Sequence, residues 1–275
     1  MNKSRIYVAW VVYLVVACLC QALFGRFPAD AFAFPVNVAI MLLWVIASWV
    51  VYRERKPAWL ATLLLSPQTT FILLAAFVAV SLIQGFHGTG LSSAWWFVAV
   101  IAALLTHLLF VTMRGTRRDR CRLARFLLIH FGVLLAIGGG FWGAPDTRQW
   151  RMAVGEKNPT CEAIDSKGRV AYLDHELRLK HFNTELYPDG TPKSHVAKIV
   201  IDGKDEATLT VNHPYALSWK DDLYLMGATP QYCIIGWVSQ PWKYVQWAGV
   251  WMIMAGAVLL FVQGAGHKTI KGGQT

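Results

Sequence analysis

The stretch from Phe126 to Trp142, FLLIHFGVLLAIGGGFW, leads straight into the chain's only long polar segment. It is long enough to cross the hydrocarbon core of a bilayer as a helix, and His130 is its only ionisable residue. An imidazole within hydrocarbon is rare and needs a partner. His130 is therefore the first candidate for a functional residue.

The rest of the chain is similarly apolar. Hydrophobic residues make up 55% of the 275 residues, and charged residues only 15%. Six runs of transmembrane length account for this composition, and they are Ile6 to Phe24, Phe34 to Val51, Pro67 to Ile83, Ala94 to Met113, Phe126 to Trp142 and Tyr244 to Val262. The sequence predicts a polytopic α-helical membrane protein with six transmembrane helices, of which the first is expected to be uncleaved.

The net charge of +10 is concentrated in alternate short loops. Lys and Arg gather there at positions 3, 5, 53, 55, 56, 114, 117, 118, 120, 122, 125, 268 and 271, whereas segment 143–242 is close to neutral. Such an excess marks the cytoplasmic side of a membrane protein. We expect a bacterial inner-membrane protein with both termini cytoplasmic and residues 143–242 outside, with membrane lipid and no nucleic acid as a partner. Attraction of anionic lipid or of a propionate-bearing ligand by the arginine-rich loop at 114–125 is a second interpretation of this charge.

Segment 143–242 has the pattern of a β-rich extracytoplasmic domain inserted between helices 5 and 6. Apolar and polar residues alternate at 177–180, 196–201 and 207–211, and Asp189-Gly190 and Asp202-Gly203 are turn signals. A domain of this size has a modest core, so we expect it to need support from the helices or a partner. Residues 57–66 are expected to lie along the inner membrane surface.

The five cysteines narrow the chemistry. They form no CxxC or CxxCH motif, which excludes a thioredoxin-like reductant and a c-type cytochrome. Cys161 and Cys233 both fall in the outer segment, where disulfides persist. A Cys161–Cys233 disulfide and two free thiols both remain open.

Two histidines lie within spans, His107 and His130, on neighbouring helices at similar depth near the cytoplasmic side. Neutral imidazole is an axial ligand for haem iron, and apolar walls with nearby arginines would suit a porphyrin. Hydrogen bonding to a backbone carbonyl or to water is the alternative for each residue. Asp and Glu are missing from every span, which disfavours ion-coupled transport.

A stripe of small residues on the fifth span separates the two sides of that helix. The stripe comprises Gly132, Ala136, Gly139, Gly140 and Gly143, and its spacing is typical of close helix packing. At about 100 degrees per residue, His130 falls on the opposite side of the helix. We expect it to face away from the packed seam, toward lipid, a ligand or another protein.

Several short motifs follow one another along the chain, and they are Ser93-Ala94-Trp95-Trp96-Phe97, Thr112-Met113-Arg114, His130-Phe131-Gly132, Tyr187-Pro188-Asp189-Gly190-Thr191-Pro192-Lys193, Val211-Asn212-His213-Pro214-Tyr215, Leu223-Tyr224 and Ser239-Gln240-Pro241. Together they resemble the membrane core and outer domain of ResB/CcsB-type cytochrome c biogenesis proteins. The similarity covers roughly residues 67–263 and lies in the order and spacing of these motifs.

This resemblance implies a membrane subunit of the System II cytochrome c synthetase. Such a subunit acts with a CcsA-type partner in haem export and in covalent haem attachment to apocytochrome c. The family's transmembrane haem ligand maps onto His130, the partner supplies the second ligand, and the expected cofactor is haem b. The chain itself is expected to be a non-catalytic or co-catalytic subunit of the haem lyase complex.

The resemblance also divides the chain into four segments. Residues 1–66 form an additional N-terminal two-helix segment, 67–142 the three-helix core, 143–242 the outer domain, and 243–275 the last helix and tail. His107 stands where the family usually has a polar residue such as Asn, so a rival hypothesis takes both haem ligands, His107 and His130, from this chain. A cofactor-free membrane scaffold, with the outer domain as an interaction module, is the alternative function, and a small transporter is a third.

Overall fold

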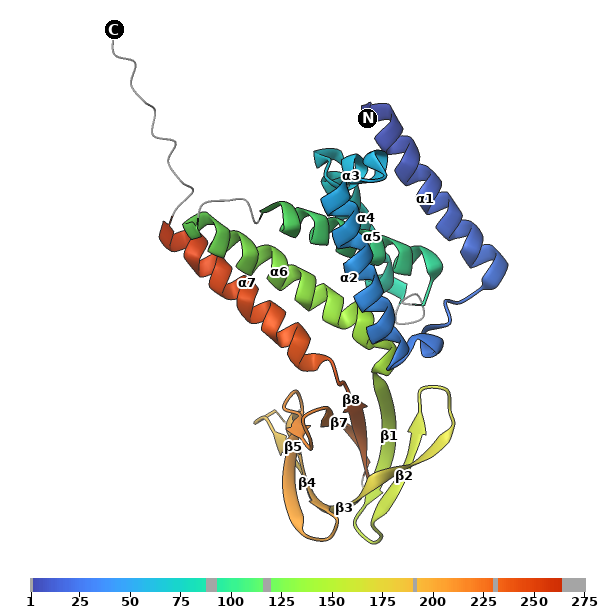
Figure 1. Ribbon diagram of the computed structural model, residues 1–275. Helices are drawn as coiled ribbons and strands as arrows, with labels where there is room; N and C mark the ends of the chain where they lie inside the picture. The colour runs from blue at the N-terminus through green and yellow to red at the C-terminus, as the bar shows by residue number, and fades with distance from the viewer. Residues whose placement is uncertain (1, 88–92, 116–119, 190–191, 230–231, 264–275) are drawn as a thin grey trace. The chain divides into compact units, whose positions relative to one another are not determined.

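A computed structural model describes residues 2–87, 93–115, 120–189, 192–229 and 232–263 (Figure 1). The chain divides into two compact units, of which one comprises Met1–Pro145 with Lys243–Thr275 and the other Asp146–Trp242. Arginines 117 and 118, lysines 268 and 271, and Gly190 of one expected turn lie outside the described residues.

The helical unit contains six long helices, α1 (Lys3–Phe24), α2 (Val36–Glu54), α4 (Pro67–His87), α5 (Trp95–Gly115), α6 (Arg120–Gly143) and α7 (Lys243–Gln263). Among the described residues these six are long and apolar enough to cross a membrane. The six predicted helices are therefore confirmed as helices. Helix α6 begins at Arg120 rather than Phe126, because hydropathy detects only the apolar part of a helix and Arg has a good helix propensity.

The segment between α2 and α4 forms a short separate helix, α3 (Ala58–Leu64). The chain bends after it, because Pro67 cannot continue a helix but fits the first position of the next one. The Ser66 side chain caps α4 by accepting a hydrogen bond from the Thr69 N–H at 3.2 Å. This bend leaves the last carbonyl groups of α3 in need of partners from elsewhere.

Helix α5 is the centre of the helical unit. Half of the residues in its most apolar stretch are buried, a larger share than in any other of the six helices. Its residues Ile101, Leu105 and Leu109 pack against Leu134 of α6 in one buried cluster. Its Leu104 and Phe110 join Trp10 of α1 and the end of α3 in another.

Helices α6 and α7 lie side by side (Figure 1) and pack through glycine. A Cβ atom added at Gly132 would lie 2.9 Å from the carbonyl oxygen of Gly249, and one at Gly139 would lie 3.2 Å from the backbone nitrogen of Gln246. Side chains at these positions would hold the two backbones apart. The predicted role of the small-residue stripe in close helix packing is confirmed for Gly132 and Gly139.

The described residues of the second unit form one antiparallel sheet of eight strands. The strands are β1 (Arg148–Gly155), β2 (Thr160–Asp165), β3 (Val170–Leu186), β4 (Pro192–Ile201), β5 (Asp205–Thr210), β6 (Tyr215–Ala216), β7 (Asp221–Ala228) and β8 (Tyr232–Ser239). Their order is β5-β4-β3-β2-β1-β8-β7-β6, so the first and last long strands of the unit are neighbours. The sheet curls until β5 approaches β6 and β7 (Figure 1). The prediction of a β-rich segment between the fifth and sixth long helices is confirmed.

The curled sheet encloses a single apolar core. Alternate residues of each strand point into it, for example Met152 and Val154 of β1, which are 1% and 0% exposed, whereas Ala153 between them is exposed. Leu209 of β5 and Ile235 of β8 complete it from opposite ends of the strand order. Curling lets one small sheet bury its inner face without a second layer.

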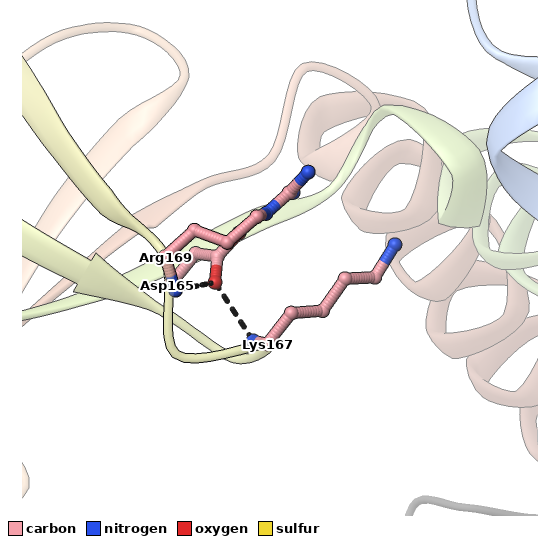
Figure 2. Close-up of polar contacts among 3 residues, drawn as sticks. All are labelled: Asp165, Lys167 and Arg169. Atoms are coloured by element: carbon pink, nitrogen blue, oxygen red, sulfur yellow. Dashed lines mark hydrogen bonds and ion pairs between the residues drawn. The ribbon is translucent and has the colours of Figure 1, made fainter.

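Two tight turns reflect local sequence. At the β4–β5 hairpin, Asp202 and Gly203 both have positive φ, 50° and 71°, as expected for an Asp-Gly turn that matches the twist of the strands. At the β2–β3 hairpin, the Asp165 carboxylate accepts hydrogen bonds from the backbone N–H groups of Lys167 at 2.8 Å and Arg169 at 2.9 Å (Figure 2). The Arg169 guanidinium also pairs with it at 2.7 Å. The Arg169 backbone hydrogen bond foremost, with these other contacts, lowers the pKa of Asp165.

The sheet order corrects the suggested disulfide. Cys161 on β2 and Cys233 on β8 are free thiols, and β1 lies between their strands. Backbones two strands apart are separated by about 10 Å, whereas a disulfide needs Cα atoms within about 7 Å. The Cys161–Cys233 bond is therefore absent from this structure, because forming it would require β1 to leave the sheet.

Candidate functional site

His130 belongs to the side of α6 that faces α5. Phe126 and Leu134, one turn before and after it, are 7% and 9% exposed, and Leu134 packs on α5. The glycines that contact α7 lie on the opposite side of α6. The expectation that His130 faces away from the glycine seam is therefore confirmed, and its ring is half-buried.

Phe126 holds the His130 ring in place. The two ring centroids are 3.9 Å apart with an angle of 22° between the planes, so the rings stack. Phe126 is itself fixed against Gly115 at the end of α5, where a Cβ atom would lie only 1.8 Å from the Phe126 ring. Glycine at 115 therefore makes room for the stack.

The hydrogen bond of His130 sets its tautomer. Its Nδ1 lies 3.0 Å from the carbonyl oxygen of Phe126. Because a carbonyl can only accept, Nδ1 carries the proton and the lone pair is on Nε2. Metal-binding histidines commonly donate one ring N–H to a backbone carbonyl in this way and bind through the other nitrogen. The chemistry of His130 thus fits an axial ligand.

His107 has a different environment. It is 3% exposed, and its ring nitrogens contact the Leu64 carbonyl oxygen at 2.7 Å and the Thr70 hydroxyl at 3.0 Å. The carbonyl requires the proton on Nδ1, so Nε2 accepts the hydrogen bond of the Thr70 hydroxyl. Leu64 ends α3, and His107 supplies the partner that its carbonyl lacks within the helix. These bonds join His107 to α3 and α4 rather than to His130.

A second polar cluster at the same bend was not foreseen from the sequence. The Trp10 indole of α1 donates to the Thr69 hydroxyl at 2.9 Å, and that hydroxyl donates to the Leu63 carbonyl at 2.7 Å. Thr69 is fully buried. The Ser66-Pro67 start of a helix, followed by two threonines, was the available signal. These hydrogen bonds connect α1, α3 and α4. Breaking them would leave the Leu63 carbonyl unpaired, which is costly in an apolar environment.

Two of the four histidines of the β unit, His175 and His195, have side-chain partners nearby. His175 Nδ1 lies 2.6 Å from the Asp202 carboxylate, and this hydrogen bond foremost lowers the pKa of Asp202. His195 Nδ1 lies 3.0 Å from the Thr184 hydroxyl. The side chains of His181 and His213 are exposed. Within the part of the chain that the structure describes, no three His, Cys, Asp or Glu side chains gather as a metal site.

The cavities of the helical unit include three that described residues line. Two are apolar, one of about 500 Å³ between α2, α5 and α6 and one of about 740 Å³ between α1, α2, α3 and α5. The third, of about 690 Å³, is polar and lies where α1, α3, α4 and α5 meet. His130 lines none of these three, so none of them is an enclosed pocket for a ligand of His130.

Together these features define a class of protein in which six apolar helices carry an antiparallel β unit between α6 and α7. Residues 115–234, which include His130 and most of the β unit, match the ResB-like family. The ResB resemblance seen in the sequence is confirmed over these residues.

Other comparisons are distant. No curated protein matches the chain. The solved structure of "Cytochrome c Heme Lyase CcmF" shares 11% identity with a TM-score of 0.39, over 71% of this chain and 34% of that one. The chain therefore spans about a third of the length of that protein.

Proposed function

We propose that this chain is a membrane subunit of System II cytochrome c biogenesis, and that His130 is an axial ligand of haem b. The single observation that carries the ligand role is the Nδ1 hydrogen bond to the Phe126 carbonyl, which places the lone pair on Nε2. The ResB-like match over residues 115–234 supports the pathway. Haem supplies the reactive vinyl groups that form thioether bonds to the cysteines of apocytochrome c.

The second axial ligand comes from a CcsA-type partner rather than from His107. His107 would have to give up the Thr70 hydrogen bond at its lone-pair nitrogen before it could bind iron. Loss of that bond would leave a buried polar group unsatisfied.

The β unit is the docking module for the partner or for apocytochrome c. It presents exposed apolar side chains on neighbouring strands, with Ile164 opposite Val170 and Glu162 opposite Tyr172, and Ile164, Val170 and Tyr172 are 50%, 55% and 75% exposed. Apolar patches of this kind mark interaction sites. Bond formation belongs to the complex, so the chain acts as a non-catalytic or co-catalytic subunit. The charge distribution supports an inner-membrane location with both termini in the cytoplasm and this unit outside.

Absorption spectroscopy of the full chain purified with a co-expressed CcsA-type partner tests the ligand role. We expect a Soret band in the wild type, its loss in His130→Gly, and its partial return when imidazole is added to that variant. His181→Gly, which removes an exposed histidine of the β unit, is the matched control and should leave the band unchanged. An unchanged band in His130→Gly refutes the ligand role, and the absence of any band in the wild-type complex favours a cofactor-free scaffold.

A further inference from the structure

The polar cavity of about 690 Å³ gathers positive charge from distant parts of the chain. Its lining includes Lys3 near the start of α1, Arg55 directly after α2, and Arg114 near the end of α5. None of the described residues that line it is Asp or Glu. Three cations around one hollow, without a lining carboxylate, form a site for an anion.

Local contacts orient two of these cations. The Arg114 guanidinium donates to the Leu65 carbonyl oxygen at 3.5 Å, at the bend between α3 and α4. The Arg55 guanidinium carbon lies 5.0 Å from the centre of the Tyr52 ring, a cation–π contact. These contacts limit the positions of both side chains without neutralising their charge.

The beginning of α4 adds to the positive potential. Pro67 and Gln68, in its first turn, line the cavity together with Ser66. The first turn of a helix carries a partial positive charge. The opposing negative end of α3 is offset, because its Leu64 and Leu65 carbonyl groups receive hydrogen bonds from His107 and Arg114. The backbone and the side chains therefore favour the same sign of ligand.

The position of the cavity indicates the kind of anion. Its lining lies near one end of α1, α2, α4 and α5, and Ile6, Ala58 and Ala61 give it an apolar wall. If these helices cross a bilayer, their ends are at the depth of lipid phosphates, with acyl chains beside the apolar wall. We propose that this cavity binds the phosphate of an anionic phospholipid. The inference is independent of His130 and of haem.

The role of positive charge in membrane orientation does not explain why three cations line the same cavity. An excess of Lys and Arg fixes orientation wherever the residues lie within a loop. Arg5, Arg53 and Lys56 come from the same loops and are exposed, but they do not line the cavity. They therefore provide a charge-matched comparison for the three lining cations.

The test measures lipid binding by native mass spectrometry of the full chain in neutral detergent. The probes are dioctanoyl phosphatidylglycerol, dioctanoyl phosphatidylcholine and inorganic phosphate. We expect phosphatidylglycerol to bind in preference to both others and to weaken as salt is raised. The variant Lys3→Gln/Arg55→Gln/Arg114→Gln should lose about tenfold or more in phosphatidylglycerol affinity, since each cation near a membrane surface contributes severalfold. The control Arg5→Gln/Arg53→Gln/Lys56→Gln should change it less than about threefold.

Three outcomes would overturn the proposal. Equal losses in both triple variants would mean general charge attraction rather than a site. Equal binding of phosphatidylcholine would remove the preference for an anion, and competition by inorganic phosphate at equal concentration would identify a free-phosphate site instead. If the triple variant does not fold, the single variants Lys3→Gln and Arg5→Gln, which each remove one exposed charge, are compared in their affinity for phosphatidylglycerol. Equal affinities of these two variants would refute the site.

Discussion

The contact between α6 and α7 gives a quantitative prediction for Gly249→Ala. A Cβ atom at Gly249 would lie 2.4 Å from the Ala136 backbone nitrogen and 2.6 Å from the Gly132 carbonyl oxygen. Both are backbone atoms of α6, so no side-chain rotation can remove the overlap. The helices would have to separate at this point.

The size of the effect follows from the required separation. Heavy atoms in ordinary contact are about 3.5 Å or more apart, so the backbones must move by about 1 Å, and a gap of that size loses a quarter to a half of the local dispersion energy. Overpacking of this kind costs about 1–3 kcal/mol, whereas alanine gains about 1 kcal/mol over glycine as a helix former. Because the overlap is with two backbone atoms that no rotation can move, we take the upper part of this range, about 2–3 kcal/mol, which leaves a net loss of about 1–2 kcal/mol in the free energy of unfolding.

Thermal unfolding of the full chain in detergent, followed by tryptophan fluorescence, measures this loss. A decrease in Tm of a few degrees is expected for Gly249→Ala. The matched control is Gly140→Ala on α6, where the nearest atom to an added Cβ, the Gln246 Oε1, is 3.9 Å away. The control should be as stable as the wild type or slightly more stable. A Gly249→Ala protein that unfolds at or above the wild-type temperature would refute the account of the glycine seam.

Three other predictions concern single side chains. Replacing His107 by Leu removes the partner of the Leu64 carbonyl and should lower the free energy of unfolding by about 1–3 kcal/mol. A variant with the same thermal unfolding temperature as the wild type would contradict the capping role of His107. In the folded chain without reductant, Cys161 should react with an alkylating reagent at pH 8 while Cys233 does not, because burial raises the pKa of the Cys233 thiol to about 11. If neither thiol is labelled until reductant is added to the unfolded chain, the two cysteines form a disulfide after all. The pKa of Asp165 is lower in the folded than in the unfolded chain, so the stability it contributes is present above the unfolded value of about 4 and is lost as pH falls through the folded value. The difference in thermal stability between Asp165→Asn and wild type at pH 7 should therefore shrink as the pH falls below about 4, and a difference that does not change with pH would exclude this carboxylate as the cause.

Local sequence was sufficient to predict those features that depend on residues close together in the chain. The length of the apolar runs gave the six long helices, the Asp202-Gly203 pair gave a turn with two positive φ values, and alternation in 196–201 and 207–211 gave strands. Helical spacing placed His130 on the opposite side of α6 from its glycines. These features depend on neighbours within a few residues, and such neighbours are visible in the sequence.

The strand order and the hydrogen-bond partners of His107 and His130 depended on tertiary structure. Sequence separation does not reveal that β1 lies between the strands of Cys161 and Cys233, and so it left a disulfide open that the sheet excludes. His107 and His130 look alike in sequence, as single imidazoles in apolar helices. Only the bend at Ser66-Pro67, which brings the Leu64 carbonyl and Thr70 to His107, distinguishes them.

The sequence by itself determined the helices, the presence of the β unit and the side of α6 on which His130 lies, because apolar length and periodicity fix these features locally. Tertiary structure alone decided that His107 caps α3, that β1 pairs with β8 in a sheet whose β5 edge approaches β6 and β7, and that Lys3, Arg55 and Arg114 surround one cavity. The physical reason is the same in each case. A buried polar group, a strand edge or a cluster of like charges is defined by partners that are distant in sequence, and those partners meet only when the chain has folded.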